Sequence, residues 1–386
     1  MWIELPDEII ENIKEITNPL DKSIIIIDTL FTSMIKCQHI IFGSETLLKY
    51  LERCDLISPT NRKFIQWIRQ QYIYVYECYE ILPYKINVIL QGDTIKRVGD
   101  IFYVPLKFLY EVRETKLLSE NENDALLFLN IFSHVNKVKK LSSNFSIRFE
   151  NDSFHGGNAP SKLNQAIIEE RIMICLIDSD KLYVNGKHGD TYRGANDVYK
   201  KIKNNHVIHM KELNVREKEN LIPPRLYLCI TENCKVLLEI LDGFIDNENI
   251  MKFFDLKDGD KFKNTTDENW LSNYQEIFDK CIEKEIYIEP PEDMEGRESY
   301  LCIKGIGAKL CDLVNAMILD PSEKYLDYME QHSVDENKKM LINDFRDKVM
   351  DVLPEYLKKE WEEIFNLLFS WGCCLSKDIL PTYGLE

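Results

Sequence analysis

Three carboxylates stand directly after two strand-like segments in the middle of the chain. Glu150 follows residues 145–149, which alternate between apolar and polar, and Asp178 and Asp180 follow the apolar run 171–177. In an open parallel sheet the carboxyl ends of the strands lie along one edge and form the ligand crevice, so these side chains are expected to meet. Clustered carboxylates repel one another unless a cation neutralises them. Because oxygen ligands without His or Cys favour Mg²⁺ or Mn²⁺, the pattern predicts a hard-metal site.

The elements that must position these carboxylates alternate between strand and helix. From Phe145 to about Leu226 the sequence predicts a strand at 145–149, a helix at 160–170, a strand at 171–177, a helix at about 196–204 and a strand at 207–210. The continuous apolar run 171–177 is typical of a strand buried on both faces. Strands that alternate with helices through short links form a parallel sheet with right-handed crossovers. We therefore predict a Rossmann-like α/β core.

Helical patterns dominate on both sides of this core. Ile9, Ile13 and Ile16 share one helical face. A hairpin between residues 87–91 and 101–105 is the strand pair expected before the core. The predicted organisation is a mainly helical N-terminal domain at 1–140, an α/β domain at 141–228 and a helix-rich, acidic C-terminal domain at 229–386.

The net charge of −17 argues against a protein that coats nucleic acid without specificity. Residues 181–218 are an exception, with nine Lys and Arg against four Asp and Glu, a net charge of +5. This window is a region where a polyanion would be tolerated, although a solvated helix face explains it equally well.

Composition also bears on the compartment. The apolar run at 24–27 is stopped by Asp28, so it is too short to span a bilayer. The eleven cysteines are scattered and contain no CxxC pair, which favours reduced, buried thiols over zinc ligands or disulfides. We expect a cytoplasmic protein without a membrane partner.

The order of these motifs resembles the Toprim family, which has Glu at the end of one strand and Asp-x-Asp at the end of the next. The matching pieces are Phe149-Glu150-Asn151-Asp152 and Cys175-Leu176-Ile177-Asp178-Ser179-Asp180. Downstream, Arg216-Glu217-Lys218-Glu219-Asn220-Leu221 is similar to a segment of the OLD-like Toprim effectors of anti-phage systems, including the PARIS effector. The resemblance covers about 80 of the 386 residues.

The resemblance implies a metal-dependent endonuclease that hydrolyses phosphodiesters of DNA or of RNA such as tRNA. Its metal ligands would be Glu150, Asp178, Asp180 and Glu217, holding one or two Mg²⁺ or Mn²⁺ ions. Glu219 would complete the second metal or orient the water, and in a helix only one of Glu217 and Glu219 could face the site. Lys181, Arg216 or Lys218 would offset the charge of the phosphate in the transition state.

The chain departs from the family in two respects. Asn151 stands where Toprim proteins usually have Gly after the glutamate. The chain also lacks a GxxxxGK[ST] motif. The resemblance therefore implies a defence effector whose ATPase or sensor is a separate polypeptide, and a homodimer is considered as well.

Two other classes of protein remain open. In a haloacid-dehalogenase-type phosphatase Asp178 would be the nucleophile and Asp180 the acid, but Leu182 stands where Thr or Val is preferred. A Toprim-shaped subunit without catalysis would use its helical flanks to bind a partner.

Three further sequence features are less specific. His155 and His188 lie in glycine-containing loops, where each is either a phosphate contact or a plain polar residue. The turn Gly305-Ile306-Gly307 either offers amides to DNA phosphate or simply starts a helix. The aromatic and aliphatic residues between Trp361 and Trp371 follow helical spacing and are predicted to lie in the core.

Overall fold

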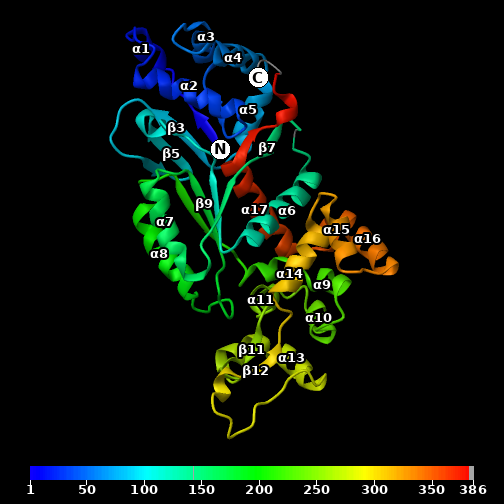
Figure 1. Ribbon diagram of the computed structural model, residues 1–386. Helices are drawn as coiled ribbons and strands as arrows, with labels where there is room; N and C mark the ends of the chain where they lie inside the picture. Colours follow the sequence, from blue (N-terminus) through cyan, green and yellow to red (C-terminus); the bar gives the residue numbers. More distant parts are fainter. Residues whose placement is uncertain (142, 382–386) are drawn as a thin grey trace.

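The computed structural model describes residues 1–141 and 143–381 and shows two sheets flanked by helices (Figure 1). The first sheet has the strand order β2-β1-β3-β5-β4, and the second has the order β10-β9-β6-β8. The first is built from β1 (Trp2–Glu4), β2 (Ile40–Phe42), β3 (Lys85–Ile89), β4 (Lys96–Val98) and β5 (Ile101–Pro105). The second is built from β6 (Lys116–Ser119), β8 (Glu150–Ser153), β9 (Met173–Ile177) and β10 (Ile208–Glu212).

The N-terminal part contains helices, as predicted, and in addition a five-stranded sheet. Its helices are α1 (Ile9–Lys14), α2 (Lys22–Ile35), α3 (Glu45–Arg53), α4 (Pro59–Gln70) and α5 (Tyr72–Ile81). The expected hairpin is wrong, because β3 pairs with β5 in parallel. The antiparallel partner of β5 is β4, joined to it by a turn at Gly99 with φ of 61°.

The second sheet is entirely parallel, which confirms the predicted α/β core. Its crossovers are α6 (Glu122–Lys139), α7 (Ala159–Ile168) and α8 (Asp190–Ile202). Helices α7 and α8 cover one face, and α6 with α17 (Glu355–Gly372) covers the other (Figure 1). In β9, Met173, Cys175 and Ile177 pack toward α7 and α8, whereas Ile174 and Leu176 join the larger core. Burial on both faces explains the continuous apolar run.

The first predicted strand does not belong to this sheet. Residues Phe145–Ile147 form β7, which pairs antiparallel with β13 (Cys373–Leu375). The sheet strand is β8, and it begins at Glu150 instead of ending there. The central position beside β9 is taken by β6, which precedes the expected domain boundary at residue 141.

The C-terminal part is helix-rich, as predicted, and adds one small hairpin. Its helices before α17 are α9 (Pro224–Ile230), α10 (Lys235–Asp242), α11 (Glu248–Phe253), α12 (Phe262–Thr265), α13 (Glu268–Glu283), α14 (Ala308–Val314), α15 (Lys324–Gln331) and α16 (Glu336–Val352). Strands β11 (Gly259–Lys261) and β12 (Leu301–Lys304) pair antiparallel and lie with α13 at the end of the molecule remote from α1–α4 (Figure 1). Trp361 and Trp371 of α17 are fully buried, which confirms the predicted core.

The described cysteines are free thiols, and most are buried. Over residues 1–141 and 143–381, no helix is both long and apolar enough to cross a membrane.

Candidate functional site

Glu120 occupies the position that the sequence assigned to Glu150. It follows β6 directly, and β6 lies beside β9, so Glu120 and Asp178 leave the carboxyl ends of neighbouring strands. Burial raises the pKa of Glu120, and the nearby carboxylates of Asp124, Asp180 and Glu217 raise it further. Glu120 is therefore part of the carboxylate cluster that the strand topology was expected to create.

Glu150 lies at the opposite, amino-terminal edge of the sheet. Its register partner in β6 is Lys116, the first residue of that strand. The Glu150 carboxylate is bound by Arg171, with Nη2 to Oε2 at 2.5 Å, and lies 3.8 Å from Nζ of Lys116. The hydrogen bond from Arg171 lowers the pKa of Glu150. The prediction that Glu150 is a metal ligand is therefore wrong, because the strand before it pairs outside the sheet.

The start of α6 brings a second acid to the cluster. Asn121 and Asp124 form a capping box, in which each side chain accepts from the backbone N–H of the other at 3.1 Å. This cap fixes Asp124 close to Glu120 at the carboxyl edge of the sheet. Nζ of Lys218 lies 2.6 Å from Oδ1 of Asp124 and balances its charge.

Asp178 and Asp180 lie where the sequence placed them, just beyond β9. Burial raises the pKa of Asp178 well above its usual value, and repulsion from surrounding carboxylates adds to the shift. Asp180 adopts a left-handed conformation with φ of 53°, and its N–H donates to the Arg216 carbonyl at 3.0 Å. A Cβ at Gly189 would collide with the Asp180 side chain, so only glycine permits this close approach.

Both Glu217 and Glu219 belong to the cluster, because the segment is extended at Glu217 and turns only afterwards. Glu217 has φ of −140° and ψ of 166°, and the 3₁₀ turn Lys218–Leu221 follows it. Each of the two carboxylates raises the pKa of Asp178. Glu219 is only 1% exposed, and within the described chain neither of its carboxylate oxygens has a hydrogen-bonding partner. Burial first, and then the charge of Glu217, raise the pKa of Glu219 to about 7.

Lys257 is the cation that sequence reasoning missed. Its Nζ lies 3.1 Å from Oε2 of Glu217. Burial lowers its pKa, but the charges of Glu217, Glu219 and Asp178 outweigh burial and raise it. Lys257 stands in a polar loop of the C-terminal part, where no local pattern distinguishes it from other lysines.

The turn Gly305-Ile306-Gly307 holds this lysine loop in place. The N–H groups of Gly305, Ile306 and Gly307 donate to the carbonyls of Asp258, Leu256 and Lys257 at 3.2, 2.9 and 2.8 Å. These amides are therefore engaged within the protein, which supports the structural interpretation of the turn over a phosphate contact.

Two of the three predicted phosphate-binding cations are buried in internal ion pairs. Arg216 is 8% exposed and pairs with Asp255. Lys218 is 7% exposed and pairs with Asp124. The expectation that Arg216 and Lys218 face a phosphate is therefore wrong, because each guanidinium or ammonium group neutralises a buried carboxylate. Lys181 remains partly exposed and lies 2.8 Å from Glu212.

The carboxylate oxygens of the cluster are of the type that binds a hard cation. In this structure, however, they do not surround a common point. As they stand, no three Asp, Glu, His or Cys residues of the described chain converge tightly enough to hold a metal ion. Burying a carboxylate without a partner costs free energy. Both carboxylate oxygens of Glu219 are buried without a hydrogen-bonding partner in the described chain. The residues available to a Mg²⁺ or Mn²⁺ ion share oxygen donors at one sheet edge: Glu120, Asp178, Asp180, Glu217 and Glu219.

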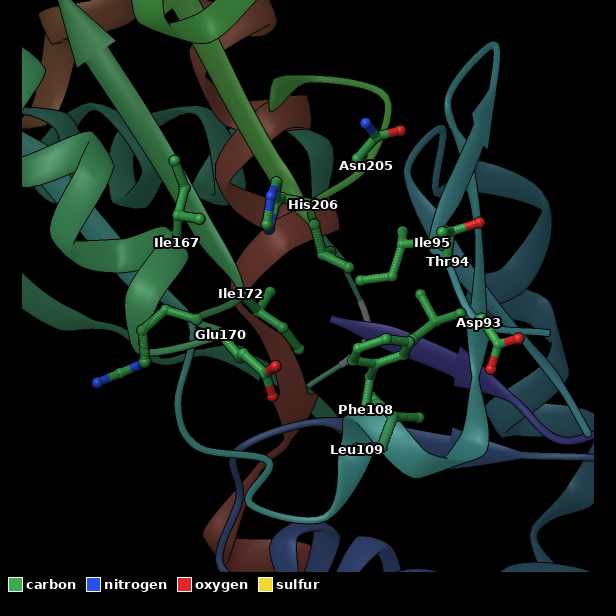
Figure 2. Close-up of a pocket in the computed structure, with 13 residues that line it drawn as sticks. Asp93, Thr94, Ile95, Phe108, Leu109, Ile167, Glu170, Ile172, Asn205 and His206 are labelled. Atoms are coloured by element: carbon green, nitrogen blue, oxygen red, sulfur yellow. The ribbon is translucent and has the colours of Figure 1, made fainter. Parts of the chain in front are cut away.

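A separate cavity of about 220 Å³ opens near the amino-terminal edge of the sheet (Figure 2). Ile172 and Val207, which immediately precede β9 and β10, line it together with His206 and Phe108. Its described lining includes none of the clustered carboxylates, so this cavity is not part of the candidate site.

Fold and site together define an α/β protein with a carboxylate cluster at the carboxyl edge of a parallel sheet. Comparisons with protein-family models, curated proteins and solved structures found no significant match for this chain.

Proposed function

We propose that this protein is a metal-dependent nuclease of the Toprim type. The observation that carries the proposal is that Glu120 and Glu219 lie near enough to Asp178, at one sheet edge, to raise its pKa, with both oxygens of buried Glu219 unpartnered in the described chain. A strand-end glutamate beside a strand-end Asp-x-Asp is the Toprim arrangement, and Glu120 supplies it in place of Glu150.

Each part of the cluster has a distinct task in this proposal. Asp178, Asp180 and Glu120 would hold Mg²⁺ or Mn²⁺, with Glu217 completing the ligand set. The bound ion would supply Lewis acidity and activate the attacking water. Glu219, whose pKa is raised to about 7, is suited to accept a proton from that water. Lys257 would offset the charge of the phosphate in the transition state, and Lys181, which follows Asp180, would contact a neighbouring part of the bound strand.

The phosphatase alternative explains fewer of these residues. It would use Asp178 and Asp180, but Leu182 stands where that class of enzyme prefers Thr or Val. It also assigns no role to Glu120 or Glu219. We therefore favour phosphodiester hydrolysis, on DNA or on RNA such as tRNA.

The biological setting follows from the same resemblance. These 386 residues contain no ATP-binding GxxxxGK[ST] motif, and we propose that an ATPase or sensor partner triggers cleavage. We propose a cytoplasmic effector of bacterial anti-phage defence, for which a homodimer is one arrangement.

The test is cleavage of supercoiled plasmid and of total tRNA by the purified protein with Mg²⁺ or Mn²⁺. We expect cutting that EDTA abolishes and that Asp178→Asn lacks, and the substrate that is cut distinguishes a DNase from an RNase. Cutting that Asp178→Asn retains would refute the assignment. If the wild type cuts neither substrate, with or without candidate partner proteins, the subunit without catalysis becomes the better account.

A further inference from the structure

Glu212, the last residue of β10, gathers three donor side chains at the carboxyl edge of the sheet. Nζ of Lys181 and Nε2 of His188 lie 2.8 and 2.9 Å from the same Oε1 atom. The Tyr192 hydroxyl also hydrogen bonds to Glu212, and its ring stacks on the imidazole at 4.3 Å. Because a carboxylate only accepts hydrogen bonds, Nε2 of His188 must donate. Glu212 therefore fixes the position of both Lys181 and His188.

This cluster borders the candidate metal site. Lys181 directly follows Asp180, and His188 directly precedes Gly189, whose backbone packs against the Asp180 carboxyl group. Glu212 pairs in register with Ile177, the residue before Asp178. The loop from Lys181 to Gly189 thus carries a cation and an imidazole along the β10 side of the carboxylates.

A groove of about 450 Å³ begins at the same residues. Lys181 and Glu212 line its start. Farther along, the groove is lined by charges of both signs, from Lys252 and Lys359 and from Glu248, Glu360 and Glu363. The side chains of Lys181 and His188 are 20% and 33% exposed, so ligands can reach them. A polynucleotide whose scissile phosphate lies at the carboxylates would pass this cluster, because Lys181 directly follows Asp180.

We infer that Lys181 and His188 bind a backbone phosphate next to the scissile one, and that Glu212 is the positioning residue that holds them. This inference rests on the proposed nuclease function. A phosphate offers anionic oxygens to both the ammonium and the imidazole N–H, and such contacts fix the register of the strand without reading its sequence. In the free protein Glu212 takes these donors, which keeps them oriented toward the site.

Binding of a fluorescent oligonucleotide, measured by anisotropy in EDTA over a range of salt concentrations, tests the inference without cleavage. Each phosphate contact contributes about 0.7 to 0.9 to the slope of log affinity against log salt. We expect Lys181→Met to weaken binding about 5- to 10-fold and to reduce the slope by about one contact. Lys181→Arg should restore the slope. The matched control Lys201→Met, an exposed site near the end of α8, should change neither quantity.

His188 and Glu212 require a second readout. His188→Gln should raise KM several-fold, because it removes a phosphate contact. Glu212→Gln removes a negative charge near the phosphate, so KM should not rise. It also releases Lys181 and His188 from their fixed positions, so kcat should fall. A structural role alone would not separate KM from kcat in this way. Thermal melting of each variant verifies that it is folded.

The outcomes separate the two proposals. A wild type that cuts nucleic acid while Lys181→Met retains the wild-type slope overturns this inference and leaves the nuclease function intact. A wild type that binds with a Lys181-dependent slope but never cuts supports the phosphate site and refutes the nuclease function. Absence of oligonucleotide binding by the wild type overturns the inference as well.

Discussion

Nζ of Lys257 lies 3.1 Å from Oε2 of Glu217, and this contact joins the C-terminal part to the carboxylate edge of the central sheet. The loop that carries Lys257 is fixed from two sides. Asp255 pairs with Arg216 and also accepts from the Asp258 N–H at 2.8 Å, and the Gly305–Gly307 turn binds the other side of the loop. The C-terminal part therefore completes the charge balance of a site whose acids come from the sheet.

Lys257→Met should destabilise the metal-free protein at pH 8. It leaves the buried carboxylates of Glu217 and Glu219 without their cation, which is itself partly exposed, at a cost on the order of 1 to 3 kcal/mol. Mg²⁺ should then raise the melting temperature of the variant more than that of the wild type. Differential scanning fluorimetry in EDTA and in Mg²⁺ measures both effects, and equal Mg²⁺ shifts in the two proteins would contradict this prediction.

Two glutamates at opposite edges of one sheet form a matched pair. Glu120→Gln removes a candidate metal ligand and should lower the cleavage rate at least about 100-fold. Glu150→Gln removes only an ion pair that is partly exposed, so the rate should stay near that of the wild type and stability should change by about 1 kcal/mol or less. Single-turnover cleavage assays compare the two, and the opposite ranking would restore Glu150 to the site.

The buried carboxyl group of Glu219 predicts a pH dependence of stability. Its pKa is raised in the folded protein to about 7 from an unfolded value of about 4.3, so it opposes folding increasingly as pH rises through this interval. Glu219→Gln should therefore gain stability relative to the metal-free wild type between pH 5 and 7, on the order of 3 kcal/mol.

Urea denaturation in EDTA at several pH values measures this difference. The exposed substitution Glu232→Gln serves as the control and should show no such gain. Added Mg²⁺ should reduce the advantage of Glu219→Gln, because the cation stabilises the ionised carboxylate in the wild type. A difference that does not vary with pH would show that Glu219 is not under this electrostatic stress.

Arg216 is expected to act in folding and not on the substrate. Arg216→Met leaves Asp255 buried and unpaired and should cost about 3 to 5 kcal/mol. Adding Asp255→Leu should recover part of this loss, because the carboxylate that pairs with Arg216 is then absent, whereas Glu217 and buried Asp260 still lack the charge of Arg216. Equilibrium unfolding of the two variants measures the recovery, which would be absent if Arg216 stabilised the fold through contacts other than Asp255.

Sequence patterns located the elements that are buried on both faces. The apolar run before Asp178 became β9, and the strand expected at 207–210 is β10 at 208–212. The helix expected from about residue 196 is α8, which begins earlier, at Asp190, and ends at Ile202. The aromatic spacing of α17 also predicted its burial correctly. In these segments local periodicity and tertiary burial coincide, so the sequence alone was sufficient.

The sequence pointed to the wrong glutamate, Glu150, because the apolar–polar alternation before it marks a strand that does not pair within the central sheet. Residues 145–147 alternate clearly but pair with β13, more than 220 residues away in the sequence. The true edge strand β8 reads Glu-Asn-Asp-Ser and has no apolar pattern. Strand β6 has only four residues, and Glu120 after it looks like the polar start of a helix. A short apolar strand that is followed by a glutamate and then by a long helix was the sequence pattern that would have identified Glu120.

The basic window 181–218 shows a further limit of sequence reasoning. Arg216 and Lys218 are buried in ion pairs, and Lys211 binds Glu363 at 2.6 Å. Of the cations in this window, Lys181 borders both the carboxylates and the groove. A charge count along the chain therefore cannot separate cations that meet a ligand from cations that hold the fold together.

Equilibrium binding of Mn²⁺, followed by the electron paramagnetic resonance signal of the free ion, tests the central claim most directly because it needs neither substrate nor activator. We predict that the wild type and Glu150→Gln bind at least one ion per chain, whereas Asp178→Asn and Glu120→Gln lose this binding while remaining folded. A folded wild type that binds no Mn²⁺ in the millimolar range, or an Asp178→Asn variant that binds it as the wild type does, would contradict the assignment of a metal site to these carboxylates.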